Sequence, residues 1–187
     1  MTPVFRTIKV VDGNIINWPA QLKQLEADFG KPVKIPFFTL PDSGTFRLRI
    51  TLGDDALVEI EPYAPPQNIR LTLYPEPIDG PKIKTLFYRS RGFIRDYAKQ
   101  MGCDDALVVC SDGYLTEASN ANFFYELKGK YYTPDPDLPY LFGLTLKTLK
   151  LPFEYVKIKP QELPPGANIY LCNSLIGVMK TTYSSSS

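Results

Sequence analysis

Two stretches of the sequence decide the expected fold: Lys82-Ile83-Lys84-Thr85-Leu86-Phe87-Tyr88, and about thirty residues later Leu115-Thr116-Glu117-Ala118-Ser119-Asn120. The first follows a proline-rich segment and leads into a run with apolar residues at helical spacing. A lysine desolvated at such a junction, here Lys84, would be able to attack an aldehyde. The second stretch places one carboxylate, Glu117, in an otherwise uncharged run, where it would approach a flat ring edge closely.

Both groups also have a simpler interpretation. Lys84 is one of 21 basic residues, and long charged side chains mostly stay in water. Glu117 would equally suit the end of a strand, with its carboxylate facing solvent. The chemical hypothesis therefore depends on the residues that accompany the two groups.

Composition limits the possible partners. A chain of 187 residues, 44% of them hydrophobic, can bury a core as one compact unit or as two small lobes. The 21 basic residues nearly balance the 20 acidic ones, which argues against nucleic acid or a membrane surface as a partner. No apolar run approaches the roughly 20 residues that span a bilayer. We expect a cytoplasmic protein.

Cysteine and histidine restrict the chemistry further. The three cysteines form no CxxC pair, and their odd number favours reduced, buried thiols. The absence of histidine excludes Ser-His-Asp and Cys-His nucleophile pairs and every histidine-based zinc site. An enzyme with this sequence must carry protons on a lysine, a carboxylate or a tyrosine, or use a cofactor.

The first part of the chain predicts a small sheet with one helix. An alternating run, Phe5 to Val11, ends at the turn Asp12-Gly13, and a short amphipathic helix begins at Pro19 and ends at Gly30. Three further strands are expected at 45–52, 56–63 and 69–74. The proline-rich run 74–81 cannot continue a strand. We expect residues 1–76 to form a small N-terminal α/β lobe.

The second part predicts a mixed α/β lobe over residues 82–183, followed by a frayed tail at 184–187. A helix is expected from Leu86 to Met101, with Gly102 at its C-terminal cap. Strands are expected at 106–110, 114–116, 153–158 and 168–172, with a hairpin at 122–127 and 130–133. A short helix is expected to start within 141–145.

Several short motifs, in this order and spacing, resemble a known family. They are Lys84-Thr85-Leu86, Asp105-Ala106-Leu107, the run from Asp112 to Phe123, Thr133-Pro134 and Leu141-Phe142-Gly143-Leu144-Thr145. The pattern resembles the class IV, pyridoxal-phosphate-dependent aminotransferases, which include branched-chain and D-amino-acid aminotransferases and aminodeoxychorismate lyase. Cys172-Asn173-Ser174-Leu175 resembles a segment of the lyase branch.

The resemblance implies a two-lobe fold-type IV enzyme of the α/β (α+β) class. Its small lobe would be an α/β sandwich, and its C-terminal lobe would have a β-barrel-like core. The cofactor would be pyridoxal 5′-phosphate, the substrate a small amino compound, and the assembly a homodimer.

The resemblance also implies roles for single residues. Lys84 would be the Schiff-base lysine and would move a proton between the substrate Cα and C4′ of the cofactor. Glu117 would keep the pyridine nitrogen protonated, so that the ring accepts the electrons of the broken Cα–H bond.

Further residues would bind the phosphate and the substrate. The phosphate would lie against the amides of Leu144 and Thr145, the Thr145 hydroxyl and Ser174. Arg47 and Asn120 would bind the substrate. A surface salt bridge is an equal alternative for Arg47, which Arg49 follows on the same face of its strand.

The sequence departs from the family in its first helix and after the lysine. Gln21 and Gln24 stand where members typically have a histidine and a phosphate-binding arginine, and a neutral amide cannot offset phosphate charge. Tyr88 stands where the lyase branch tends to have an arginine.

Within the family, the segment from Cys172 to Leu175 and the compact chain favour a lyase. It would convert 4-amino-4-deoxychorismate to 4-aminobenzoate and pyruvate. A branched-chain or D-amino-acid aminotransferase is the near alternative. A catalytically impaired binding protein of the same fold is the alternative from another class, and Gln24 is the residue that suggests it.

Overall fold

The computed structural model describes residues 2–183, and the chain forms two compact units. The first unit contains the chain up to Pro66 together with Ile83–Leu86. The second contains Gln67–Lys82 and the chain from Phe87 onward. The tail expected at residues 184–187 lies outside the described residues.

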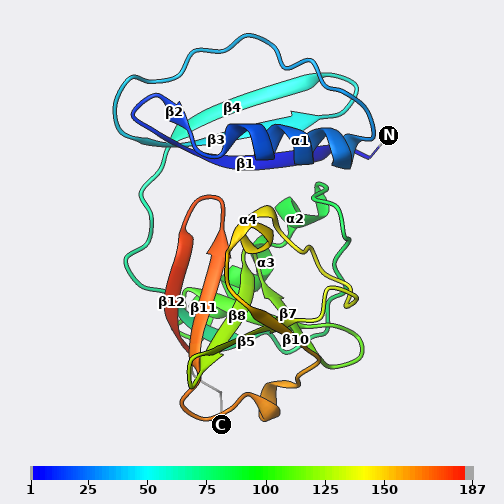
Figure 1. Ribbon diagram of the computed structural model, residues 1–187, viewed down its shortest axis with the longest axis vertical. Coiled ribbons are helices and arrows are strands. Elements are labelled where there is room, and N and C mark those ends of the chain that lie inside the picture. Colours follow the sequence, from blue (N-terminus) through cyan, green and yellow to red (C-terminus); the bar gives the residue numbers. More distant parts are fainter. Residues whose placement is uncertain (1, 184–187) are drawn as a thin grey trace. The chain divides into compact units, whose positions relative to one another are not determined.

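The first unit is a four-stranded antiparallel sheet in the order β2-β1-β3-β4, with one helix against it (Figure 1). Its elements are β1 (Val4–Val11), β2 (Asn14–Ile15), α1 (Trp18–Phe29), β3 (Thr45–Leu52) and β4 (Ala56–Pro62). Asp12 and Gly13 have φ of 46° and 73°, the conformation of a tight hairpin turn with a right-handed twist. The predicted turn and helix are both present.

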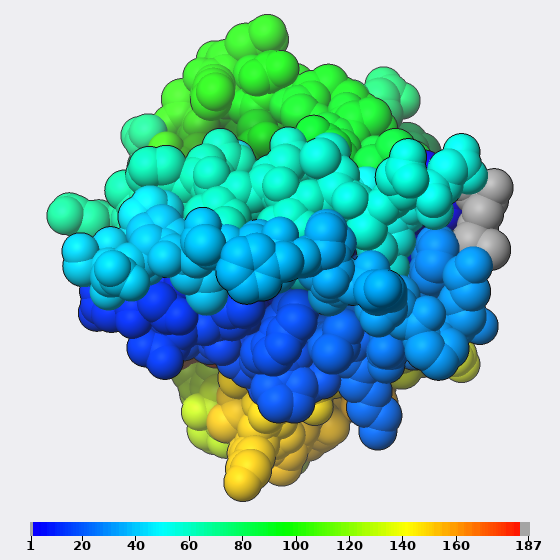
Figure 2. Space-filling model, turned by 90° about the horizontal axis from the view of Figure 1, so that it is seen from above, coloured from blue at the N-terminus to red at the C-terminus, as the bar shows by residue number. Residues whose placement is uncertain are grey.

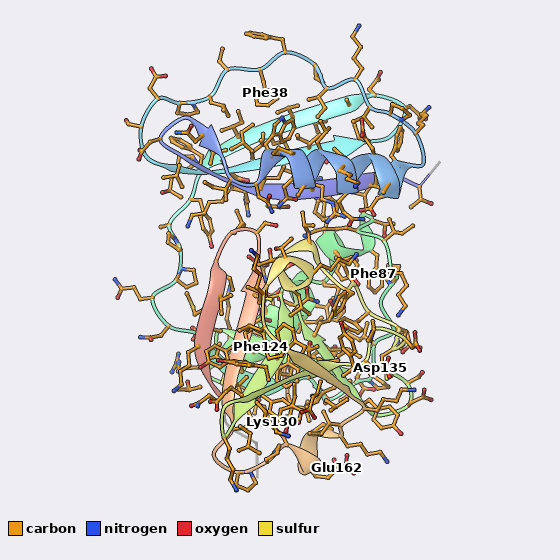
Figure 3. All side chains as sticks on the ribbon, in the orientation of Figure 1. Phe38, Phe87, Phe124, Lys130, Asp135 and Glu162 are labelled. Atoms are coloured by element: carbon orange, nitrogen blue, oxygen red, sulfur yellow. The ribbon has the colours of Figure 1, made fainter. Side chains whose placement is uncertain are left out.

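The core of this unit lies on one face of the sheet because side chains alternate along each strand. Ile8, Val10, Leu48 and Ile50 are buried there with Leu25 of α1. The segment 31–44, light blue in Figure 2, packs four more apolar side chains against the same cluster, and Phe38, labelled in Figure 3, is one of them.

Residues Ile83–Leu86 return to the first unit beside β1. The backbone N–H of Phe5 donates to the carbonyl of Lys84 at 3.0 Å, and Val4 pairs with Thr85 in an isolated bridge. Lys84 is therefore held against the first strand, although it follows a segment of the second unit.

The second unit is an eight-stranded sheet in the order β10-β9-β8-β11-β12-β5-β6-β7. An additional pairing of β7 with β8 closes the strands from β8 to β7 into a barrel. The strands are β5 (Arg70–Leu73), β6 (Asp105–Val109), β7 (Leu115–Ala118), β8 (Asn122–Leu127), β9 (Lys130–Pro134), β10 (Phe153–Val156), β11 (Asn168–Asn173) and β12 (Gly177–Tyr183). The expected mixed fold with a β-barrel-like core is confirmed.

Two strand expectations are wrong. The strand at 69–74 does not join the N-terminal sheet, because β5 pairs in parallel with β6 and β12 of the barrel. The strand at 168–172 is not the last one, because β12 follows it as the second half of a hairpin. Its run Lys180-Thr181-Thr182 has no apolar alternation that would have indicated it.

The helices of the second unit are α2 (Phe87–Ser90), α3 (Gly92–Gln100) and α4 (Leu144–Thr148), with a 3-10 turn, η1, at Pro160–Glu162. The continuous helix expected from Leu86 to Met101 is wrong, because it is interrupted at Arg91. Gly102 has φ of 71° and ends α3 as predicted, with its N–H donating to Lys99. Within residues 2–183, no helix is long and apolar enough to cross a membrane.

Candidate active site

Glu117 lies on β7, paired with Val108 of β6 on the face of the barrel that α3 covers, and it is only 5% exposed. Its Oε1 accepts a hydrogen bond from Nη1 of Arg91 at 2.6 Å and one from the hydroxyl of Tyr88 at 3.2 Å. The Arg91 side chain is 1% exposed, so both charges of this ion pair are buried. The simpler interpretation of Glu117, a strand-end carboxylate facing water, is wrong.

The backbone of Gly80 forms another wall around this carboxylate. A Cβ atom at residue 80 would lie 2.7 Å from the Tyr88 hydroxyl and 3.0 Å from Oε1 of Glu117. Only glycine therefore allows the chain to approach the pair this closely. Burial raises the pKa of the Tyr88 phenol, and the charge of Glu117 raises it further, so Tyr88 stays a neutral donor.

A row of paired residues crosses three strands at this end of the barrel. Glu117 of β7 is paired with Asn122 of β8, and Asn122 is paired with Cys172 of β11. Burial raises the pKa of the Cys172 thiol to about 12, so it is an inert apolar group here.

Asn122 connects this row to the start of α4. Its amide oxygen accepts from the N–H of Gly143 at 2.9 Å, and its NH₂ group donates to the carbonyl of Leu141 at 2.6 Å. Gly143 is the N-cap residue of α4, so the first helical N–H groups, those of Leu144 and Thr145, begin directly beside the row. Asn122 was not among the predicted site residues.

Ser174 lies in the turn that joins β11 to β12, two residues beyond Cys172. The side chain of Asn173 holds this turn, because its oxygen accepts from the N–H groups of Leu175 and Ile176. Its NH₂ group donates to the carbonyl of Asn120 at 3.0 Å. The structure thus places Glu117, the start of α4, Asn120 and Ser174 around one end of the barrel.

Lys84 belongs to the first unit, on the sheet face that carries Phe5. Its Nζ lies 5.2 Å from the centroid of the Phe5 ring, and the guanidinium of Arg49 lies 5.8 Å from the same centroid. Arg47 binds Glu61 through two hydrogen bonds, so the salt-bridge alternative given for Arg47 is present. Arg49, and not Arg47, therefore lies over the same Phe5 ring as the amine of Lys84.

Gln24 of α1 belongs to a network of hydrogen bonds within the first unit, with Asp28 and Arg6. The amide of Gln24 donates to Oδ1 of Asp28 at 2.8 Å, and Arg6 of β1 pairs with the other oxygen of that carboxylate. Arg6 and Asp28 are both nearly fully buried. Burial lowers the pKa of Arg6, and Asp28 opposes this effect. Gln24 is thus committed to a structural contact under α1.

The second unit fits a pyridine ring with an attached phosphate. A buried carboxylate suits a protonated ring nitrogen, and a glycine-opened helix start with a nearby serine suits phosphate oxygens. The close approaches at Gly80 and Gly143 leave no room for a side chain at either position.

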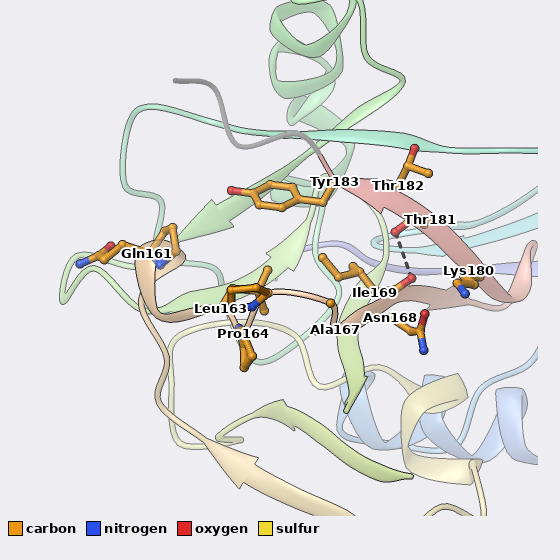
Figure 4. Close-up of a pocket in the computed structure, with 13 residues that line it drawn as sticks. Gln161, Leu163, Pro164, Ala167, Asn168, Ile169, Lys180, Thr181, Thr182 and Tyr183 are labelled. Atoms are coloured by element: carbon orange, nitrogen blue, oxygen red, sulfur yellow. Dashed lines mark hydrogen bonds between the residues drawn. The ribbon is translucent and has the colours of Figure 1, made fainter. Parts of the chain in front are cut away.

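A pocket of about 670 Å³ lies elsewhere in the second unit, where the loop after η1 meets β11 and β12 (Figure 4). Tyr183, Lys180 and the prolines of that loop line it, and the Thr181 hydroxyl donates to the carbonyl of Ile169 at 3.2 Å. Its described lining contains none of the predicted site residues. It is not the candidate active site.

The chain is similar to known proteins in its sequence pattern and in its fold. The sequence model of the family described as amino-transferase class IV matches residues 41–182. No curated protein sequence matches the chain at a significant level.

Three solved structures illustrate the similarity of fold. A candidate amino-acid aminotransferase from Mesorhizobium loti is 18% identical, with a TM-score of 0.82 over 98% of this chain and 100% of that one. A candidate 4-amino-4-deoxychorismate lyase from Legionella pneumophila is 18% identical, with a TM-score of 0.77 over 97% and 82%. An aminotransferase from Brucella abortus bound to pyridoxal phosphate is 16% identical, with a TM-score of 0.72 over 97% and 80%.

Proposed function

Because this chain belongs to the class IV aminotransferase family, we propose that it is a pyridoxal-phosphate-dependent lyase acting on a small amino compound. The predictions of the family, of an enzyme and of pyridoxal 5′-phosphate as its cofactor are confirmed by the family match. The substrate that we propose is 4-amino-4-deoxychorismate.

The observation that carries the proposal is the set of bonds made by Asn173. This residue lies in the lyase-like segment Cys172 to Leu175, and its side chain joins the turn around Ser174 to the carbonyl of Asn120. Two motifs 53 residues apart are thus fixed to each other at the barrel end that carries Glu117. The similarity in fold to the candidate lyase from Legionella pneumophila supports the same choice.

We assign the cofactor contacts residue by residue. Glu117 would accept a hydrogen bond from the ring nitrogen, and the amides of Leu144 and Thr145 would bind the phosphate. The hydroxyls of Thr145 and Ser174 would complete that phosphate site. Lys84 would hold the cofactor covalently and, once substrate has displaced it, would take up the proton from the substrate carbon. When bound, the cofactor supplies an electron sink for that carbon.

The proposed reaction needs no oxidant, reductant or water. The Lys84 amine removes the proton from the ring carbon that bears the amino group, and the bond from the neighbouring carbon to the enolpyruvyl oxygen breaks. The six-membered ring becomes aromatic as 4-aminobenzoate, and the released enolpyruvate takes up one proton and becomes pyruvate. Substrate and products therefore balance in atoms and electrons.

The substrate has carboxylates that need a cationic partner. Arg47 was the predicted residue, but it is already bound to Glu61. We propose Arg49 as a second candidate, because it lies over the same phenyl ring as Lys84 and its own ion pair, with Glu59, is longer, at 3.8 Å. Asn120 is exposed, its carbonyl accepts from Asn173, and its side-chain amide donates to the Ser119 hydroxyl at 3.3 Å. Substrate would bind the Asn120 side chain in competition with that bond to Ser119.

Transamination is the second candidate, because the similarity to the candidate aminotransferase from Mesorhizobium loti extends over all of that chain. A catalytically impaired binding protein is the third candidate. Gln24 stands where the family has a phosphate-binding arginine, and its side-chain amide donates to Asp28 instead. A homodimer and a cytoplasmic location complete the proposal. The three free cysteines support a reducing compartment.

The proposal is tested by absorption spectra of the protein titrated with pyridoxal phosphate. We expect a visible band in the wild type, its loss in Lys84→Ala and its retention in Lys99→Ala, a matched control at an exposed lysine of α3. An unchanged band in Lys84→Ala would remove Lys84 from the mechanism. Pyruvate release from 4-amino-4-deoxychorismate without a keto acid supports the lyase, and strict dependence on a keto acid would refute it.

A further inference from the structure

Arg91 was not among the predicted site residues, yet it is the group that binds Glu117 most closely. Its Nη1 lies 2.6 Å from Oε1 of Glu117, and its guanidinium lies 5.3 Å from the centroid of the Tyr88 ring. We propose that Arg91 is a positioning residue that fixes the Glu117 carboxylate. By neutralising part of its charge, Arg91 weakens the attraction between that carboxylate and the proton on the cofactor's ring nitrogen. This inference rests on the proposed function.

The local backbone conformation directs the guanidinium of Arg91 toward Glu117. The chain breaks its helical path at Arg91, between α2 and α3, and Arg91 has φ of −75° and ψ of 16°. Its side chain is therefore buried against Glu117 of β7 and does not lie on the solvent face of a helix. Gly92, inside the expected helix, is the sequence signal that marks the break.

The pair is poorly explained by stability alone. Burying two charges costs desolvation energy that an ion pair recovers only with good hydrogen bonding on all sides. Among the described residues, Nε and Nη2 of Arg91 have no hydrogen-bond partner, and both atoms are buried. An apolar side chain would fill this space at lower cost, so the guanidinium calls for a functional explanation.

The functional explanation follows from the charge that Arg91 brings to Glu117. A carboxylate beside a pyridine nitrogen favours the protonated ring, because opposite charges within about 4–6 Å stabilise each other. Arg91 already neutralises part of the Glu117 charge at close range in a buried site. The other titratable groups facing Glu117, Tyr88 and Tyr140, have a raised pKa and stay neutral.

The consequence for chemistry is a weaker electron sink. Transamination needs a strongly electron-withdrawing ring, because the negative charge must persist until a proton is returned to the cofactor. Elimination from a cyclohexadiene is aided by formation of an aromatic product and needs less help from the ring. Arg91 would therefore shift the reaction toward elimination and away from transamination.

The experiment uses pyridoxal phosphate labelled with ¹⁵N at the ring nitrogen, bound to the full-length protein. The ¹⁵N chemical shift, followed against pH, reports when the nitrogen loses its proton. We expect this pH to rise by about 1 to 3 units in Arg91→Gln, which keeps donors but loses the charge. Arg91→Lys should restore a value near that of the wild type, because it restores the charge.

Arg89→Gln is the matched control, because Arg89 lies two residues earlier and is exposed. It should leave the ¹⁵N titration unchanged. If Arg91→Gln does not fold, as judged by thermal unfolding, Arg91→Met takes its place with the same expected rise. A titration that stays at the wild-type pH in the charge-free variant overturns this inference alone. A wild-type protein without a Lys84-dependent band overturns the proposed function and this inference together.

Discussion

The amide oxygen of Asn122 accepts a hydrogen bond from the N–H of Gly143 at 2.9 Å. Asn122 also donates to the carbonyl of Leu141, so one side chain fixes the loop before α4 from both directions. Because Asn122 is itself paired with Glu117 and Cys172, this contact joins the proposed ring-nitrogen residue to the proposed phosphate site.

Asn122→Ala should therefore damage both stability and cofactor binding. The loss leaves an N–H and a carbonyl unpaired in a part-buried place, at a cost of about 1–3 kcal/mol for each group. Urea unfolding measures that cost, and titration with pyridoxal phosphate should show weaker binding. Asn14→Ala, at an exposed position of β2 where the side chain donates only to the carbonyl of Asp12, should change the free energy of unfolding by less than about 0.5 kcal/mol. Unchanged cofactor affinity in Asn122→Ala would separate Asn122 from the phosphate site.

Gly80→Ala tests the enclosure of Glu117. The added methyl group would meet the Tyr88 hydroxyl at 2.7 Å, which should cost about 1–3 kcal/mol of unfolding free energy. Tyr88→Phe removes that hydroxyl, so Gly80→Ala should cost less in the Tyr88→Phe background than in the wild type. A double-mutant cycle measures the difference. Additive costs would mean that the clash lies elsewhere.

Asp28→Asn tests the buried ion pair under α1. The variant leaves the Arg6 charge buried without its counterion, so we expect a loss of about 3–5 kcal/mol in unfolding free energy. Arg6→Met combined with Asp28→Asn should recover much of it, because no charge is then left in the core. Glu61→Gln breaks a half-exposed pair of the same sheet and should cost at most about 1 kcal/mol. Equal losses for the two single variants at Asp28 and Glu61 would contradict this account.

The sequence predicted what local patterns determine. Alternation identified β1 and β3, the Asp12-Gly13 turn has the predicted conformation, and Gly30 and Gly102 end their helices. The barrel was implied by family motifs, because each strand is short and its closure depends on pairing between distant segments. Glu117 was identified for its uncharged surroundings, and its burial agrees with them.

The predictions that were wrong depend on contacts between distant parts of the sequence. β5 resembles its neighbours in sequence, but parallel pairing with β6 and β12 places it in the barrel. The ion pair of Arg91 and Glu117 joins residues 26 apart in the sequence, and no local pattern predicts which arginine will be buried. Helical periodicity continues across Arg91, so the pattern predicted one helix where a buried charge interrupts it.

Asp105 gives a pH dependence that is independent of the cofactor. It is buried at the start of β6, where it accepts hydrogen bonds from the N–H of Ala106 at 2.8 Å and from the Ser119 hydroxyl at 2.9 Å. Burial raises the pKa of this carboxyl group, and the hydrogen bonds oppose the rise only in part. The folded state therefore holds this proton to a higher pH than the unfolded state does.

The sign of the effect follows from proton linkage. Between the unfolded and folded pKa values, folding takes up a proton, so Asp105 contributes stability at low pH that is lost as the pH rises. Asp105→Asn keeps the acceptor for Ala106 and removes the titration. Urea unfolding from pH 7 to pH 4 should thus show the wild type gaining stability relative to Asp105→Asn, by about 1.4 kcal/mol for each unit of pKa difference. Asp96→Asn, at an exposed position of α3, should show no such gain. A wild type that instead loses stability relative to Asp105→Asn on acidification would mean that the hydrogen bonds outweigh burial.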